Sequence, residues 1–378
     1  MIAYLKGWST KKDSFFASVA KAAGGGKALP LIPLSFHGFP ESDARAKAAM
    51  AVAKRQPKSA LVRRLKFRLI WAQYNGARRY FTRHPDRIAM CWNGITGSRR
   101  VFMEGARDAG VPTLYGELAP FPGRMQLDPK GVNALGTVPR DPGFFTAWAA
   151  GRADRQGDAW REMGTKLTAR LSRRADVGQA EADLSDEPFL FVPLQVPNDS
   201  QITMFGGWVG SVEGMIAALA EASEALPEGW HIRIKEHPSA KTSLAEPLAR
   251  AMSIAQGRLR LDNQTDTFAQ VRASRGVITI NSSVGLQSFF YDKPVIVLGE
   301  AFFALPGLVR VIGDQMALHA AMAEAESLAF DPALRAAFMN YLDQVHFPHV
   351  SEGPDGTVEI DQNAAVQRIM AAKTAIGH

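Results

Sequence analysis

Short apolar runs alternate with longer amphipathic stretches along the first half of the chain. A short apolar run bounded by polar, proline or glycine positions is typical of a buried strand, and apolar residues spaced three and four apart are typical of a helix. The predicted strands are Ile2–Leu5, Pro30–Leu34, Arg87–Trp92 and Pro112–Tyr115, and the predicted helices are Ser42–Lys54 and Ser98–Ala109. This order of elements indicates a βαβ fold.

The second half repeats the alternation more clearly. The predicted strands are Phe189–Pro193, His231–Lys235, Gly276–Ile280 and Pro294–Leu298, and the predicted helices are Val212–Ala225, Ser243–Ala255, Thr267–Ala273 and Val284–Tyr291. Parallel strands joined by helical crossovers of one hand form a doubly wound sheet. We therefore expect a second α/β domain after the first.

Two further segments set the predicted domain organisation. Arg152–Glu187 is polar and charged and has no strand-like run, so we expect it to connect the two domains. Asp361–Ala375 has the pattern of an amphipathic helix that packs back across the domain boundary. We predict an α/β protein with two facing Rossmann-like domains and an inter-domain cleft. The predicted ranges are 1–180, 186–355 and a C-terminal helix within 356–378.

Composition and cysteine content are those of a protein from the cytoplasm. The chain has 378 residues, of which 46% are hydrophobic and 21% are charged, which is typical of a soluble globular protein. No stretch of about 20 apolar residues is present to span a bilayer, and the charged, short N-terminal segment does not predict a signal peptide. The single cysteine, Cys91, cannot form an internal disulfide, which favours a reducing compartment.

Positive charge is concentrated in one basic-aromatic segment, residues 54–87, within a chain of net charge +7. The segment carries eleven Lys or Arg residues and one acid, Asp86, and the aromatic residues Trp71, Tyr74, Tyr80 and Phe81 lie among them. Basic residues with interfacial aromatics favour attraction to an anionic membrane surface. A groove for single-stranded nucleic acid and a solvated helix whose aromatics face the core are the alternatives.

Asn281-Ser282-Ser283-Val284-Gly285 joins a predicted strand to a predicted helix. The first turn of a helix has unpaired N–H groups and a partial positive charge, so it binds phosphate or carboxylate. The two serine hydroxyls add donors, and Gly285 allows a ligand to approach the backbone closely. Simple N-capping of the helix by Ser or Asn is the alternative.

Polar residues also follow other predicted strands. Lys235-Glu236-His237-Pro238 ends one strand, and proline holds the preceding residue extended, which fixes the direction of His237. His237 and Lys235 are therefore candidate phosphate contacts, and an ordinary surface turn is the alternative. Asp199, within Gln195–Gln201, and Glu117 each follow a strand, so each carboxylate is a candidate for nucleophilic or acid/base chemistry. A simple turn also explains Pro197–Ser200.

Several familiar cofactor signatures are missing from the sequence. There is no Walker A motif, no Gly-x-Gly-x-x-Gly after a strand and no Gly-x-Ser-x-Gly elbow. The eight histidines do not cluster at metal-ligand spacing. We therefore predict neither a metal nor a resident cofactor.

Taken in order, these motifs resemble those of the capsular polysaccharide biosynthesis family, which includes the bacterial retaining β-Kdo transferases. The resemblance runs from about Trp92 to Gly299. The segments that carry it are Glu117, Asp128–Asn133, Gln195–Gln201, Lys235–Pro238 and Asn281–Gln287. It implies a two-domain, GT-B-like glycosyltransferase that uses CMP-Kdo as its donor substrate and needs no cofactor.

The resemblance also implies a role for each site residue. Asp199 would be the nucleophile at the anomeric carbon, Gln201 would orient it, and Glu117 would be the base for the acceptor hydroxyl. The CMP phosphate would be held by residues of the second domain, namely His237, Lys235, Pro238, Asn281, Ser282, Ser283 and Gly285.

The chain has room for one transferase module, so it resembles the member that primes a phosphatidylglycerol-type lipid. That role implies an anionic lipid acceptor, peripheral contact with the inner face of the cytoplasmic membrane and with capsule assembly and export proteins, and no nucleic acid. Two alternatives stay open. One is transfer of another ulosonic acid, such as a sialic acid, and the other is a noncatalytic assembly factor for polysaccharide export.

Overall fold

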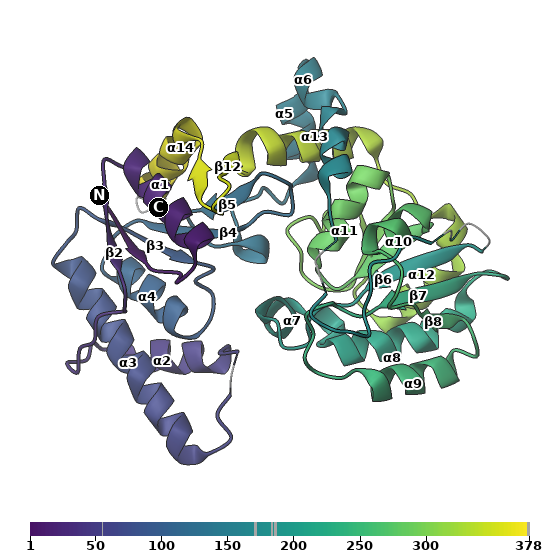
Figure 1. Cartoon of the computed structure of the whole chain (residues 1–378), viewed down its shortest axis with the longest axis horizontal. Coiled ribbons are helices and arrows are strands. Elements are labelled where there is room, and N and C mark those ends of the chain that lie inside the picture. Colours follow the sequence, from purple (N-terminus) through teal and green to yellow (C-terminus); the bar gives the residue numbers. More distant parts are fainter. Residues whose placement is uncertain (55, 170–171, 183, 185–186, 376–378) are drawn as a thin grey trace. The chain divides into compact units, whose positions relative to one another are not determined.

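The chain divides into two compact α/β units. The computed structural model describes residues 1–54, 56–169, 172–182, 184 and 187–375. The first unit comprises Met1–Val138 with Gln344–His378, and the second comprises Pro139–Asp343 (Figure 1). Both are built around a sheet of mainly parallel strands, as the predicted Rossmann-like fold requires.

The sheet of the first unit has the order β2-β1-β3-β4-β5, with all neighbours parallel except β4 and β5. Its strands are β1 (Ile2–Leu5), β2 (Gly26–Leu29), β3 (Ile88–Trp92), β4 (Thr113–Leu118) and β5 (Met125–Asp128). The helices are α1 (Thr10–Ala22), α2 (Ser42–Ala51), α3 (Ala60–Thr82), α4 (Gly97–Asp108) and α14 (Gln362–Thr374). The antiparallel edge strand β5 was not predicted.

Alternate strand residues divide the apolar core of the first unit. Ile88, Met90 and Trp92 face one side of the sheet, where they pack with residues of α1 and α14. Ile369 of α14 belongs to this core, so the C-terminal helix is part of the first unit. Helices α2, α3 and α4 pack on one another in a second cluster that contains Ile70.

All neighbouring strands are parallel in the sheet of the second unit, whose order is β11-β10-β9-β6-β7-β8. Its strands are β6 (Phe189–Pro193), β7 (His231–Lys235), β8 (Leu259–Leu261), β9 (Gly276–Thr279), β10 (Val295–Val297) and β11 (Arg310–Val311). The helices include α7 (Ser200–Phe205), α8 (Val212–Ala222), α9 (Ala245–Ile254), α10 (Thr267–Ala273), α11 (Ser283–Gln287), α12 (Gln315–Ala323) and α13 (Pro332–Tyr341). Read along the chain, this is the strand order 3-2-1-4-5-6 of dinucleotide-binding folds.

The core of the second unit lies between this sheet and helices α8, α9 and α12. Residues of β6, β7, β9 and β10 share it with these helices, as Ile232 and Ile278 illustrate. The helices α5 (Pro142–Ala149) and α6 (Ala153–Gln156) lie at the start of this unit in the sequence, and both pack against α13. No helix among the described residues is both long enough and apolar enough to cross a membrane.

Strand and domain boundaries differ in places from the sequence prediction. The strand predicted at Pro30–Leu34 is wrong, because β2 ends at Leu29 and proline at position 30 has no N–H to continue the ladder. Residues 344–355, predicted in the second domain, belong to the first unit, and residues 139–180, predicted in the first domain, belong to the second unit. The reason is local: Gly178 N–H donates to Asn263 O at 2.8 Å, and Ala180 N–H donates to Gln264 O at 2.9 Å.

Candidate active site

The strand order of the second unit places its reversal point between β6 and β9. Ligands of open α/β sheets bind outside the carboxyl ends of the strands at such a point. The segment that follows β6 contains Asp199, and the segment that follows β9 contains Asn281. The loop after β7, the neighbour of β6 on its other side, contains His237. The structure therefore brings the three motifs of the second unit to one sheet edge.

Asp199 is the N-cap of α7, and its carboxylate is fixed by the first turn of that helix. Its Oδ1 accepts from Gln201 N–H at 2.9 Å, and Ser200 Oγ lies 3.4 Å from the same oxygen. Among the described residues no hydrogen bond reaches Oδ2. Asp199 therefore caps the helix through Oδ1, as a simple turn would also require, while Oδ2 has no hydrogen-bond partner among the described residues.

Asn281 ties the end of β9 to α7. Its Nδ2 donates to Gln201 O at 2.9 Å and to Phe205 O at 3.0 Å, while its Oδ1 accepts from Gln195 Nε2 at 2.9 Å. These internal bonds occupy the amide that was predicted to bind donor, so Asn281 positions the helix that Asp199 caps. The Gln201 Nε2 atom, in contrast, is buried and has no hydrogen-bond partner among the described residues. Leaving such a donor unpaired is costly, which favours a ligand contact there.

The serines and glycine after Asn281 have separate tasks. Ser282 Oγ accepts from Val284 N–H at 3.2 Å, so Ser282 is an N-cap, as the simpler alternative proposed. Ser283 is exposed at the first position of α11. Gly285 is buried, and a Cβ there would lie 2.8 Å from Thr279 Cγ2. Tight packing of helix on strand therefore requires the glycine, and the approach of a ligand there stays a prediction.

His237 and Pro238 form a turn directly after β7. Ser239 N–H donates to His237 Nδ1 at 3.0 Å, so Nδ1 is an acceptor and the proton of the neutral ring lies on Nε2. Pro238 is buried, and its carbonyl accepts from Arg173 N–H at 3.0 Å. The turn thus fixes the direction of an imidazole N–H donor.

Lys235, predicted to contact phosphate, has a different role. Its side chain is 2% exposed, and its ammonium donates to Gly178 O, Asn263 O and Thr265 O at 2.8, 2.9 and 2.7 Å. Burial lowers the pKa of the ammonium. Because three carbonyls occupy all three protons, the prediction of a phosphate contact by Lys235 is wrong in this structure.

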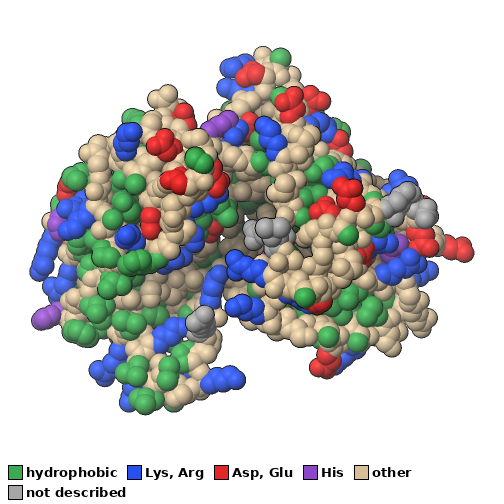
Figure 2. All heavy atoms as spheres, viewed as in Figure 1, with side chains coloured by type: hydrophobic (Ala, Val, Ile, Leu, Met, Phe, Trp, Pro, Cys, Tyr) green, Lys and Arg blue, Asp and Glu red, His purple; other side chains and the backbone are tan. Residues whose placement is uncertain are grey.

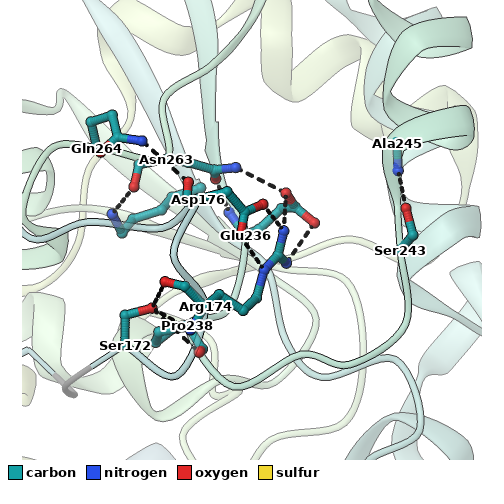
Figure 3. Close-up of polar contacts among 10 residues, drawn as sticks. Ser172, Arg174, Asp176, Glu236, Pro238, Ser243, Ala245, Asn263 and Gln264 are labelled. Atoms are coloured by element: carbon teal, nitrogen blue, oxygen red, sulfur yellow. Dashed lines mark hydrogen bonds and ion pairs between the residues drawn. The ribbon is translucent and has the colours of Figure 1, made fainter.

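Glu236 and Arg174 form a partly buried ion pair that the sequence did not reveal. Arg174 Nη1 lies 2.9 Å from Glu236 Oε1, and Nη2 lies 3.1 Å from Oε2, as Figure 3 shows. Asn263 Nδ2 donates to Glu236 Oε2 at 2.9 Å, and Asp176 holds the other side of the guanidinium. The hydrogen bond from Arg174 lowers the pKa of Asp176. This network fastens residues 172–180 beneath the His237 turn.

The carboxyl ends of β1, β3 and β4 form the corresponding edge of the first unit. Glu117 lies within β4, opposite Gln126, because the strand continues three residues further than predicted. Its Oε2 accepts from Asn93 Nδ2 at 2.9 Å. Asn93 and Trp8 follow β3 and β1 with φ of 65° and 55°, a left-handed conformation that non-glycine residues adopt rarely, although asparagine tolerates it better than most. Trp8 is also 70% exposed.

Cations surround this carboxylate edge. Lys12 Nζ lies 4.7 Å from the centre of the Trp92 ring at the end of β3. Burial lowers the pKa of the Lys12 ammonium, and the nearby Arg99 guanidinium lowers it further while Glu117 opposes the shift. The first unit thus presents one carboxylate among basic groups at its own sheet edge.

Sequence reasoning identified the motifs but missed several members of each edge. Gln195 and Glu236 stand inside motifs that were recognised, so their position was a usable signal. Arg174 and Trp8 had no such signal, because their contact and backbone conformation arise only on folding. Among the described residues no cluster of three or more His, Cys, Asp or Glu side chains could hold a metal ion.

The fold and these residues define an α/β protein with two Rossmann-like units, each with a carboxylate and amides at the carboxyl ends of its strands. The sequence profile described as "Capsule polysaccharide biosynthesis protein" matches residues 156–346, half of the chain. The chain belongs to this capsule polysaccharide biosynthesis family.

The chain is also similar to two named proteins and to one solved structure. Protein FixF of Sinorhizobium fredii is 32% identical over 68% of this chain and 58% of its own length. Capsule polysaccharide modification protein LipB of Neisseria meningitidis is 29% identical over 32% of this chain and 30% of its own. The structure of Thermosulfurimonas dismutans KpsC, beta Kdo 2,7 transferase, matches with a TM-score of 0.47 and 16% identity over 79% of this chain and 89% of that one. The chain therefore spans little more than half of FixF and less than a third of LipB.

Proposed function

We propose that this protein is a retaining glycosyltransferase that moves Kdo from CMP-Kdo onto a phosphatidylglycerol-type lipid during synthesis of a capsule polysaccharide linker. The observation that carries the proposal is Asp199, a carboxylate held at the β6/β9 reversal point with one oxygen bonded and the other without a partner among the described residues. Membership of the capsule polysaccharide biosynthesis family supports a sugar substrate.

In the proposed first step, Asp199 Oδ2 forms a bond to the anomeric carbon as the bond from that carbon to the CMP phosphate breaks, and CMP leaves with the electron pair. His237 Nε2–H donates to the departing phosphate, and the hydroxyl of exposed Ser283 adds a second donor. The buried Gln201 amide orients the sugar or the nucleophile. Asn281 and Ser282 act indirectly, by holding α7 and α11 in place.

In the proposed second step, a hydroxyl of the acceptor attacks the anomeric carbon and displaces Asp199 with its electron pair. Glu117 takes the proton of that hydroxyl. Two displacements at one carbon give net retention. The enzyme would work at the inner face of the cytoplasmic membrane, in peripheral contact with the lipid and with capsule assembly and export proteins.

The decisive experiment uses Asp199→Asn, because asparagine caps a helix as well as aspartate does but is a poor nucleophile. We expect CMP release from CMP-Kdo with lysophosphatidylglycerol to fall by more than about a thousandfold, with little change in stability. Mass spectrometry of the wild type with donor should show a sugar adduct on Asp199. Asp331→Asn, which changes the cap of α13, is the matched control and should keep full activity.

Three other outcomes would correct the proposal. Substantial turnover by Asp199→Asn removes Asp199 from the nucleophile role. Release of CMP only with another CMP-ulosonate, such as CMP-sialic acid, changes the donor and keeps the mechanism. No release with any such donor favours a noncatalytic factor in polysaccharide export.

A further inference from the structure

The first half of α3 has an unusual apolar row on its outer side. Leu61, Leu65 and Leu69 follow one another at intervals of four, so they lie on one side of the helix, and Val62 lies next to them. Their exposed fractions are 66%, 59%, 48% and 50% for Leu61, Leu65, Leu69 and Val62. We call these four residues the aliphatic row. A row of large apolar side chains in water is a mark of an interaction surface.

Basic side chains border the aliphatic row on both sides. With 3.6 residues per turn, Arg64 and Arg68 fall on one side of the row and Lys66 falls on the other. The sequence has no Asp or Glu between Lys54 and Pro85. Figure 2 shows hydrophobic and Lys or Arg side chains gathered together over the region where Figure 1 places α3.

The loop after β2 extends the same surface. Ser35 N–H donates to Ala72 O at 3.0 Å, one turn beyond Leu69, and Gly76 has no Cβ because Pro33 O occupies that place. The loop therefore lies along the helix, and its Leu34 and Phe36 are 54% and 78% exposed. The apolar surface thus continues from the helix onto a second segment.

We propose that this surface of α3 docks on an anionic lipid bilayer, with the aliphatic row among the acyl chains and Arg64, Arg68 and Lys66 at the phosphate level. Amphipathic helices that lie in the membrane interface combine an apolar side with basic flanks in this way. Each basic residue near an anionic surface adds to the attraction. This proposal of membrane docking does not depend on the transferase reaction proposed above.

The structure argues against other occupants. Single-stranded nucleic acid binds by stacking on aromatic rings, but Tyr74 and Phe81 of α3 are fully buried, and the large apolar side chains that α3 exposes are aliphatic. Tyr74 instead donates to Asp108 at 2.7 Å inside the unit. A second copy would place the same basic flanks against each other in a symmetric contact, which like charges oppose.

Vesicle flotation tests the proposal, with phosphatidylcholine vesicles that contain or lack phosphatidylglycerol. We expect the full chain to float only with the anionic vesicles and to dissociate as salt is raised. Leu65→Asp/Leu69→Asp should bind at least about tenfold more weakly, and Arg64→Gln/Arg68→Gln should weaken binding by a similar factor. The matched control is Ile254→Asp/Met316→Asp, two residues of the second unit that are 51% and 80% exposed, and it should bind like the wild type.

Equal binding by Leu65→Asp/Leu69→Asp and the wild type would overturn the proposal. The proposal would also be overturned if these two substitutions left vesicle binding unchanged but abolished self-association or binding to single-stranded nucleic acid. Folding is checked by the thermal transition, which exposed substitutions leave near the wild-type value. Because flotation needs no turnover, a failure of the proposed transferase activity is seen separately from a failure of membrane docking.

Discussion

Lys235 is an ammonium group at the end of a central strand, with each of its three protons directed at a backbone carbonyl. The carbonyls belong to Gly178, Asn263 and Thr265, so one side chain joins β7 to the segment before β6 and to the loop after β8. A buried charge is stable only when its hydrogen bonds are satisfied in this way. Lys235 therefore holds together the three segments that meet at the end of β7, just before the His237 turn.

Lys235→Met should lower the free energy of unfolding by about 2–4 kcal/mol, because it leaves buried carbonyls without a donor. Denaturant unfolding measures this loss. The Michaelis constant for the donor should stay within about twofold of the wild type for the folded variant, as expected of a group that does not contact phosphate. A stable variant with strongly weakened donor binding would restore the original phosphate role. Lys241→Met, on the loop beyond the turn, is the control.

Strand β7 has a buried histidine at one end and the His237 turn of the candidate site at the other. His231, its first residue, is 1% exposed and stacks on Phe189 at 5.5 Å between ring centres. Burial and the nearby Arg260 and Arg233 lower the pKa of His231 from 6.5 to about 4. The opposite end of the strand leads into the His237 turn. The two histidines therefore face different environments within seven residues of chain.

The lowered pKa of His231 makes stability depend on pH. Above pH 6.5 the ring is neutral in both the folded and the unfolded chain. As pH falls below 6.5, His231 becomes protonated in the unfolded chain, whereas in the folded protein it stays neutral until pH reaches about 4. Between these values the free energy of unfolding therefore decreases by roughly 1.4 kcal/mol per pH unit. The loss across this window is on the order of 3 kcal/mol.

His231→Phe should remove that part of the pH dependence while keeping the ring stack. Denaturant midpoints between pH 7 and pH 4.5 measure it, and the variant should lose less stability than the wild type over this range. The control is His37→Gln, which replaces an exposed histidine and should keep the wild-type slope. Equal slopes for His231→Phe and the wild type would show that the folded ring titrates normally.

The apolar pattern identified the central strands because their burial on both faces requires continuous apolar runs. It failed at the edges: in β8, Arg260 and Leu261 are exposed, so no buried run marks the strand. A helix in the region of α3 was only one of the alternatives for the basic-aromatic segment, because the many basic residues there mask the helical spacing of the apolar ones. The strand-end motifs located both sheet edges. The partners of Lys235 and Glu236 were not predictable, because they come from distant segments.

The two units carry different groups at their sheet edges, and this division predicts separable kinetics. The second unit holds the proposed nucleophile and the His237 donor, whereas the first holds Glu117, Asn93 and exposed Trp8. In a double displacement the donor reacts before the acceptor, so each edge serves a different step. A defect in one step should leave the other measurable.

Glu117→Gln should therefore slow transfer to the lipid acceptor by about a hundredfold or more, the range expected of a general base, yet still allow the sugar adduct on Asp199 to form. His237→Ala should act earlier, because alanine has no hydrogen-bond donor in place of the imidazole N–H that the proposal directs at the phosphate. It should raise the Michaelis constant for CMP-Kdo and slow adduct formation. Rapid quenching with mass spectrometry follows the adduct, and CMP release follows turnover. If Glu117→Gln instead formed the adduct slowly or not at all, Glu117 would act in the donor step. The two units would then not serve separate steps.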